Sequence, residues 1–354
     1  MNQPGLPDLR SGAGLAMDTT TVTADDQHNA FTDLIAWREA FWLVYTASPS
    51  HFASRQSRVV LLWSSDAIEW QEVARFNGGG QDIRDPRLAV IGDRLMLYAL
   101  LNRKFDPQPY ATICAQSDDG RNWSAFSQAV PDGWLLGKPE TPDGWYWYAL
   151  AHHLGQRTAQ LFRSTDGIQW EPHGKMFGPR GVDETALVFR PDGTLWAAAR
   201  LESGSGILGS DENGTLIATA RPPYESWTSC TCSRLTRLDG PCLFDHGRVY
   251  AVGRYQPQTG GFIHRQGSVL SRKRTAIFGI DQQELVHLAD LPSSGDTAYA
   301  GVVVRDGQLY VSYYTSNPNH DPPWIVGMFR PTRIQISRIS LAALAETADS
   351  RLNS

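Results

Sequence analysis

Ser164-Thr165-Asp166-Gly167-Ile168-Gln169-Trp170 is the most regular of three copies of one short pattern in this chain. The other two copies are Ser64-Ser65-Asp66-Ala67-Ile68-Glu69-Trp70 and Ser117-Asp118-Asp119-Gly120-Arg121-Asn122-Trp123. Each copy follows a bulky apolar stretch, which indicates a turn at the end of a strand. The copies start about 50 residues apart, a period typical of propellers and other repeat architectures.

Each residue type in the pattern has a physical role in a turn. The serine hydroxyl and the aspartate carboxylate can bind the backbone of their own turn, and glycine supplies a positive φ. The tryptophan offers a large apolar face to a neighbouring sheet. Ala67 replaces the glycine in the first copy, so we expect that turn to be slightly different or strained.

Composition limits the function classes. The 354 residues are 41% hydrophobic with 12 tryptophans, enough for one large all-β domain. The net charge of -5 offers no basic face, so no nucleic-acid partner is expected. No apolar run is long enough to span a membrane. The first residues show no secretory signal, so we expect a cytoplasmic location and leave secretion open.

The four cysteines do not indicate a metal site. Cys230-Thr231-Cys232 is spaced too tightly for the usual metal-binding pair, and no histidine cluster completes a set. We expect reduced, buried thiols, no metal and no cofactor.

Between the turns, short apolar strands alternate with Asp-Gly, Gly-Asp and Asn-Gly signals. Six units open with polar residues and run into an apolar strand, and they begin near His28, Asp82, Leu136, Val182, Leu238 and Gly295. This predicts an all-β, six-bladed β-propeller over residues 28–340. Residues 1–27 form an N-terminal segment that is a candidate for closing the last blade. Residues 341–354 form a tail in which Leu341 to Glu346 favour a turn or two of helix.

Closing six blades into a ring brings their polar openings to one mouth. They contribute Asp33, Arg84, Asp85, Lys138, Glu184, Asp296 and Tyr299, while Arg200 and Arg254 end the second strands of their blades. Carboxylates, guanidinium groups and a phenol around a shallow axial pocket suit a sugar with an anionic group.

Several of these segments resemble the sialidase superfamily. Glu184 and Arg200 lie in a blade that is similar to the one carrying the paired glutamate and second arginine of sialidases, and Gly253-Arg254 resembles the third arginine's setting. Gly295-Asp296-Thr297-Ala298-Tyr299-Ala300-Gly301, with Tyr313-Tyr314-Thr315-Ser316, looks like the sialidase tyrosine segment. The repeated turns resemble Asp-boxes, and the likeness covers roughly residues 28–340.

The resemblance implies a glycoside hydrolase, exo-acting on an anionic glycoside by a retaining displacement. Tyr299 would attack the anomeric carbon while Glu184 takes its phenolic proton, because a tyrosine needs a base near neutral pH. Asp33 or Asp85 would protonate the leaving oxygen. The expected substrate-binding residues are Arg84, Arg87, Arg200, Arg254, His51 and Asp296.

One departure from the family concerns the first blade. Sialidases carry an arginine there in a Phe/Tyr-Arg-Ile-Pro motif, and this chain has Asn29-Ala30-Phe31-Thr32-Asp33 instead. Arg84 or Arg87 from the next blade could replace that arginine. If neither does, another anionic or a neutral glycoside becomes the expected substrate.

Other interpretations stay open. Glu184 could form a structural ion pair with Arg200 or Arg254, and Tyr299 could be a core aromatic. His51 could contact a ligand or lie on the surface, and Trp324 could be a sugar platform or a packing residue. At the level of function, the alternatives are a propeller that binds a glycan or protein without catalysis, and a lyase using His51 or His152 as base. The oligomeric state is not predicted.

Overall fold

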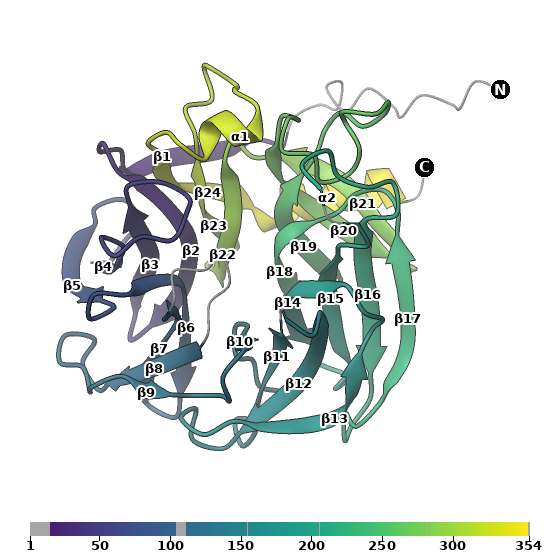
Figure 1. Ribbon diagram of the computed structural model, residues 1–354. Coiled ribbons are helices and arrows are strands. Elements are labelled where there is room, and N and C mark those ends of the chain that lie inside the picture. Colours follow the sequence, from purple (N-terminus) through teal and green to yellow (C-terminus); the bar gives the residue numbers. More distant parts are fainter. Residues whose placement is uncertain (1–14, 104–110, 154, 205, 283, 353–354) are drawn as a thin grey trace.

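The computed structural model describes residues 15–103, 111–153, 155–204, 206–282 and 284–352. In these residues the strands form six four-stranded antiparallel sheets, arranged around a common centre in Figure 1. The predicted six-bladed β-propeller is therefore confirmed.

Each of the first five blades uses four strands that follow one another in the chain, with the first strand innermost. The first blade contains β2 (His28–Trp37), β3 (Ala40–Ser48), β4 (Arg58–Ser64) and β5 (Gln71–Asn77). The second contains β6 (Asp82–Ile91), β7 (Arg94–Asn102), β8 (Ala111–Ser117) and β9 (Ser127–Gln128). The third contains β10 (Trp134–Leu136), β11 (Trp147–His153), β12 (Thr158–Ser164) and β13 (Glu171–Phe177). The fourth contains β14 (Val182–Phe189), β15 (Leu195–Leu201), β16 (Gly214–Ala220) and β17 (Trp227–Ser233). The fifth contains β18 (Asp239–Asp245), β19 (Val249–Tyr255), β20 (Arg274–Asp281) and β21 (Glu284–Asp290).

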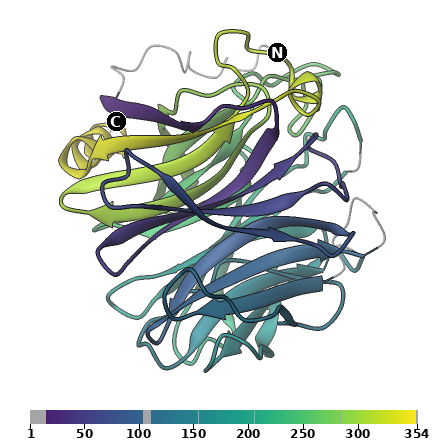
Figure 2. The ribbon, with the colours of Figure 1, turned by 90° about the vertical axis from the view of Figure 1, so that its left-hand side faces the viewer.

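The sixth blade joins the two ends of the chain. It contains β22 (Thr297–Arg305), β23 (Gln308–Thr315) and β24 (Arg333–Ser340), and its outer strand is β1 (Met17–Thr23) from the N-terminal segment. β1 pairs with β24 from Met17 opposite Ile339 onward, and Figure 2 shows the two strands side by side near the C-terminal helix. Backbone hydrogen bonds between β1 and β24 therefore close the ring, and the edge of β24 that faces β1 is paired.

Two helices accompany the strands in the described residues. The C-terminal helix α2 (Leu341–Leu352) is longer than the turn or two expected from sequence, and it buries Leu341, Leu344 and Ala348. The short helix α1 (Trp324–Gly327) lies between β23 and β24 and was not predicted. No helix in the described ranges is long and apolar enough to cross a membrane.

The three repeated turns share one set of hydrogen bonds. In each, the serine Oγ accepts from the amide at the glycine position, and the aspartate Oδ1 accepts from the next two amides. The first turn differs at its tryptophan. Trp123 and Trp170 donate Nε1–H to the carbonyls of Gly120 and Gly167, whereas Trp70 Nε1 is buried and has no hydrogen-bond partner among the residues that the structure describes. Ala67 adopts the same left-handed conformation, with φ 62°, which is strained for a residue with a Cβ.

Apolar side chains fill the spaces between neighbouring blades. One cluster joins the first and second blades through Trp42, Leu61, Leu88 and Leu97, and comparable clusters lie between other pairs of blades. At roughly 25 cal/mol per Å² of apolar surface, this burial is the main force that holds the ring closed. All four cysteines are unpaired, but of the four only Cys114 is buried as expected: Cys232 and Cys242 are half-buried and Cys230 is exposed.

Candidate active site

The site is built on a backbone feature that recurs around the ring. In β2, β6, β14, β18 and β22 the strand pairing shifts by a bulge at the mouth end. Each bulge holds a residue in the left-handed region: Phe31 (φ 57°), Asp85 (50°), Glu184 (27°), Gly240 (57°) and Tyr299 (48°). In β22 the preceding residue, Ala298, also has a positive φ of 133°. A bulge re-aims a side chain away from the alternating pattern of its strand, so equivalent positions of five blades supply the groups at the mouth.

Glu184 and Tyr299 meet across this layer, although 115 positions separate them in the chain. Tyr299 Oη donates a short hydrogen bond to Glu184 Oε1, while Glu184 Oε2 accepts from the Gly240 amide at 2.7 Å. Burial, together with the charges of Glu184 and Asp85, raises the pKa of Tyr299 well above its ordinary value. The phenol therefore stays protonated and needs the glutamate as base to become nucleophilic.

Gly240 is required at the floor of this pair. It has φ +57°, and a Cβ there would lie 3.0 Å from the ring of Tyr299. Phe31 packs on the same phenol ring edge-to-face, with 4.8 Å between centroids. Both contacts restrict the phenol ring of Tyr299 to the orientation that reaches Glu184.

Arg200 supports the glutamate from the neighbouring strand β15. Its guanidinium forms a bidentate pair with Asp183 at 2.7 and 2.9 Å, and its Nη1 lies 2.8 Å from Glu184 Oε1. Burial alone would lower the pKa of Arg200, but Asp183 and Glu184 hold the pKa well above its ordinary value. Arg200 is thus a permanent cation with two carboxylate partners.

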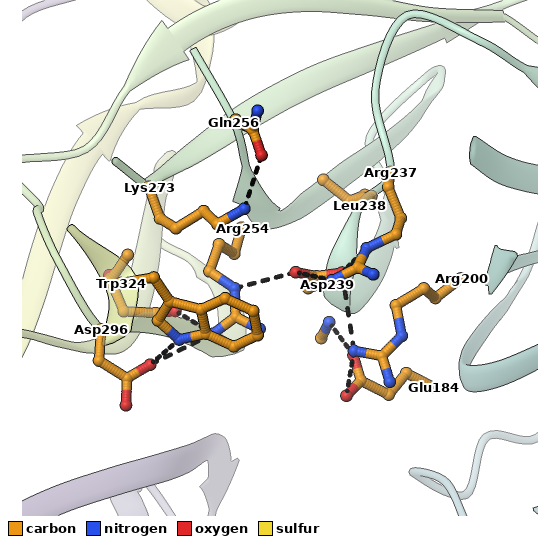
Figure 3. A network of polar contacts seen from close by, with 12 residues as sticks. Glu184, Arg200, Arg237, Leu238, Asp239, Arg254, Gln256, Lys273, Asp296 and Trp324 are labelled. Atoms are coloured by element: carbon orange, nitrogen blue, oxygen red, sulfur yellow. Dashed lines mark hydrogen bonds and ion pairs between the residues drawn. The ribbon is translucent and has the colours of Figure 1, made fainter. Parts of the chain in front are cut away.

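A second group of charges lies beside Arg200, as Figure 3 shows. Asp239 contacts Arg237 at 2.7 Å and Arg254 at 3.1 Å, and Arg200 lies 3.6 Å away. Burial alone would raise the pKa of Asp239, but Arg237, Arg254 and Arg200 hold the pKa far below its usual range. The cluster is a buried ion-pair network in which the charges compensate one another.

Arg254 is covered by Trp324, the first residue of helix α1, and Figure 3 shows the indole ring against the guanidinium. Arg254 is 1% exposed, and its Cζ lies 4.1 Å from the ring centroid of Trp324. It also contacts Asp296 Oδ1 at 3.3 Å. Trp324 is itself 8% exposed and donates Nε1–H to Asp296 at 2.8 Å. In this arrangement Trp324 is a packing residue rather than a sugar platform.

Asp296 organises this corner of the mouth. His28 Nε2 and His51 Nδ1 lie 2.9 and 2.7 Å from its Oδ2, and Tyr314 donates to Oδ1 at 3.0 Å. Burial alone would raise the pKa of Asp296, but the two imidazoles hold the pKa well below its usual value. Burial also lowers the pKa of His51, so this imidazole stays neutral near pH 7.

The ligand atoms of His28, His51 and Asp296 lie within 4.8 Å of one another, close enough to hold a cation. However, Asp296 already accepts from both imidazoles, Tyr314 and Trp324, and the Arg254 guanidinium lies against its Oδ1. A metal ion would have to displace these donors next to a fixed positive charge. We therefore interpret the cluster as a hydrogen-bonded support for the His51 loop.

Asp85 has the environment of a proton donor. Its Oδ1 is inaccessible and without a hydrogen-bond partner among the described residues, although the residue as a whole is only half-buried. Burial raises the pKa of Asp85 to about 6, despite the nearby charges of Arg87 and Arg84. A carboxyl with this pKa is protonated in a useful fraction near neutral pH, as general acid catalysis requires.

Asp33 has a different environment. It is 1% exposed and accepts from Lys138 Nζ at 2.7 Å, from the Leu34 amide at 2.9 Å and from the Leu88 amide at 2.8 Å. These bonds tie the first blade to the second and third. The three donors occupy both carboxylate oxygens of Asp33, so this side chain serves as a link between blades.

Two adjoining pockets open at Tyr299. The mouth pocket is lined by Asp85, Arg87, Leu100, Leu135, Leu136, Gly137, His152, Glu184, Thr185, Gly240, Pro241 and Tyr299. The inner pocket continues along the axis past Thr185 and Gly240, and it also contains Asp33, Lys138, Glu140 and Cys242. The mouth pocket therefore combines the phenol of Tyr299 and the carboxyl groups of Glu184 and Asp85 with an apolar wall of leucines.

The predicted arginines do not all reach this pocket. Arg200, Arg254 and Arg84 are absent from its lining, and Arg84 is paired with Asp82 and with the His51 carbonyl. Arg87 lines both pockets.

Sequence reasoning missed Gly240, Asp183, Asp239 and the capping by Trp324. Gly240 lies in the bulge of β18, and Asp239 and Asp183 each come one residue before the bulged position of their strand. An alignment of the six blade openings that matches Glu184 with Tyr299 could have found all three. No sequence pattern indicated that Trp324 covers Arg254, because this contact depends on the path of the segment that precedes β24.

Comparisons with known proteins agree on the fold. No protein-family model and no curated protein match the sequence. Among solved structures, phage phi92 endosialidase matches with a TM-score of 0.70 at 10% identity, over 92% of this chain and 69% of that chain. Trypanosoma rangeli sialidase in complex with sialic acid matches with a TM-score of 0.62 at 13% identity, over 96% of this chain and 61% of that chain. A K499G mutant of NanB sialidase from Streptococcus pneumoniae matches with a TM-score of 0.64 at 10% identity, over 94% and 71%. The chain therefore has a sialidase-like six-bladed β-propeller fold and spans only part of the length of these enzymes.

Proposed function

We propose that this protein is a retaining glycoside hydrolase that acts on an anionic glycoside bound in the mouth pocket. The observation that carries the proposal is the hydrogen bond from Tyr299 Oη to Glu184 Oε1, inside a pocket that also holds Asp85. The structural likeness to sialidases supports the proposal at the level of the fold.

The chemistry divides into two displacements. In the first, Tyr299 Oη attacks the anomeric carbon, its proton passes to Glu184, and Asp85 gives its proton to the departing oxygen. In the second, Asp85 takes a proton from water as the water attacks the anomeric carbon, and Tyr299 leaves and recovers its proton from Glu184. Arg200 and the Gly240 amide hold Glu184 in place through both steps. Each catalytic group ends the cycle in its starting protonation state.

We assign the general acid to Asp85 in preference to Asp33. Asp85 lines the mouth pocket with Glu184 and has a pKa raised by burial to about 6. Asp33 lies in the inner pocket and is bonded to Lys138 and two backbone amides. General acid catalysis should therefore be lost in Asp85→Asn and retained in folded Asp33→Asn.

The test is hydrolysis of aryl glycosides of acidic and neutral sugars by wild type and by Tyr299→Phe, Glu184→Gln and Asp85→Asn. We expect losses of at least 10²-fold in kcat/KM for the first two. Asp85→Asn should lose less on a 4-nitrophenyl glycoside than on an alkyl glycoside, because 4-nitrophenolate needs little protonation to leave. Arg94→Gln is the control. It also removes a positive charge, but Arg94 lies on β7, donates to Gln116 and does not line the mouth pocket.

Equal turnover by wild type and all three variants would refute the assigned roles. An unsaturated product absorbing in the ultraviolet would instead indicate a lyase with His152, which also lines the mouth pocket, as a candidate base. Binding of glycans without turnover would favour a non-catalytic propeller.

A further inference from the structure

The charges around the mouth differ in whether a protein carboxylate already neutralises them. Arg84 pairs with Asp82, Arg237 with Asp239 and Glu202, and Lys138 with Asp33. Arg200 and Arg254 each contact two or more carboxylates. A guanidinium that is held by protein carboxylates has little of its charge left for a ligand.

Arg87 is the exception among the cations that line the pockets. Its guanidinium donates to the Pro86 carbonyl at 3.0 Å and forms no ion pair with any residue that the structure describes. It is the only cation among the described residues lining the mouth pocket. Its Cζ lies 5.9 Å from the centroid of the Tyr299 ring, so it stands beside the proposed nucleophile.

Neighbouring residues limit where an anionic group can bind. Phe31 occupies the bulge of the first blade and packs on Tyr299, so that blade presents an aromatic ring rather than a cation at this level. Trp324 covers Arg254 on the far side. The remaining cationic wall of the mouth pocket is the second blade, where Arg87 lies two residues beyond Asp85 in the same strand.

Resting on the proposed function, we infer that Arg87 alone anchors the substrate carboxylate, in place of a clamp built from Arg200 and Arg254. The substrate class is a glycoside of a carboxylated sugar whose single negative charge lies over the second blade. The fork of Arg87 can bind both oxygens of a carboxylate, and the same contact keeps that charge away from Glu184. Arg87 is thus a specificity-determining residue, and Arg200 and Arg254 are positioning residues.

The test compares each acidic substrate with its uncharged methyl ester. The probes are 4-nitrophenyl glucosiduronic acids, the 4-methylumbelliferyl ketoside of N-acetylneuraminic acid, and their methyl esters. A charge-assisted contact is worth about 1.5–3 kcal/mol, so wild type should prefer an acid over its ester by roughly 10–150-fold in kcat/KM. Arg87→Gln should abolish this preference by lowering the acid rate and leaving the ester rate within about 3-fold.

Two further variants separate specificity from structure. Arg87→Lys keeps the charge and loses the fork, so it should retain part of the preference. Arg94→Gln should retain all of it. Arg87 also lowers the pKa of Asp85, so Arg87→Gln should shift the alkaline limb of the kcat/KM profile to higher pH equally for acid and ester. The ratio of the two rates cancels this effect.

Equal losses on acid and ester in Arg87→Gln would overturn the inference, as would a wild-type enzyme that does not distinguish them. Either result leaves the proposed function intact if Glu184→Gln and Tyr299→Phe are inactive on the ester. If wild type hydrolyses no probe, the proposed function fails, and calorimetric titration with free N-acetylneuraminate and glucuronate then decides the role of Arg87. Equal binding by wild type and Arg87→Gln, or no binding by wild type, would refute the anchor.

Discussion

Replacing Asp85 by asparagine should lower activity on alkyl glycosides and yet stabilise the protein at alkaline pH. Burial raises the pKa of Asp85 to about 6, against about 3.9 in an unfolded chain. The unfolded chain therefore releases this proton at a lower pH than the native protein, and the free energy of unfolding falls as pH rises between about 4 and 6. Above about pH 7 the full loss of stability is reached. It amounts to roughly 3 kcal/mol, because each unit of pKa difference between the folded and unfolded chain corresponds to about 1.36 kcal/mol.

Asparagine keeps the size of the side chain and removes the titration. The stability difference between Asp85→Asn and wild type should therefore grow by about 2 kcal/mol between pH 4.5 and pH 8. With an unfolding entropy of about 2.1 cal/mol/K per residue, a chain of 354 residues converts this into about 3 °C of melting temperature.

Thermal melts of both proteins across this pH range, followed by tryptophan fluorescence, provide the measurement. Asp93→Asn is the matched control, because Asp93 lies on the exposed turn between β6 and β7 of the same blade. The pH dependence of the Asp85→Asn difference is read against that of Asp93→Asn. A pH-independent difference for Asp85→Asn would show that this carboxyl does not titrate near pH 6, and the general acid would have to be sought elsewhere.

Three further predictions concern the framework around the site, and each is tested by chemical or thermal unfolding. Gly120→Ala should lower the free energy of unfolding by about 3 kcal/mol, because Gly120 has φ +74° and a Cβ there would overlap an indole ring of the first blade. Gly247→Ala, at φ +73° with open space around it, should lower the free energy of unfolding by only about 1–2 kcal/mol, and equal losses would refute the steric argument. Asp33→Ala should lower the free energy of unfolding by about 3–5 kcal/mol, because Lys138 loses its ion-pair partner. The double variant with Lys138→Met should recover part of this stability, and no recovery would contradict the pairing. Glu140→Gln should flatten the fall in melting temperature between pH 5 and pH 8, because burial raises the pKa of Glu140 to about 7, and an unchanged slope would contradict that pKa.

The fold was predictable because its signals are local and repeated. The turns at Asp66, Asp119 and Asp166 depend on residues within five positions of one another, so the pattern is visible in the chain itself. The number of blades followed from spacing, and the meeting of Glu184 and Tyr299 followed from closing the ring.

What sequence could not supply depends on long-range packing. Arg254 is a plausible ligand contact in the chain, and only the position of Trp324 shows that it is covered. Asp33 and Asp85 are both acids near a blade opening, and their different partners decide which one is free to donate a proton. These differences arise from contacts between blades, which no local pattern records.

The bulges in five innermost strands have a consequence for how such a ring can change its chemistry. Each bulged residue lies outside the regular strand pairing, so its side chain can be exchanged while the ladder beside it stays intact. Phe31, Asp85, Glu184 and Tyr299 are in this sense four positions at which the side chain can change while the scaffold is kept. Gly240 is the exception, because a Cβ there would lie 3.0 Å from the Tyr299 ring. New substrates or reactions can therefore arise in descendants of this architecture through single substitutions, one blade at a time, without loss of the folded framework.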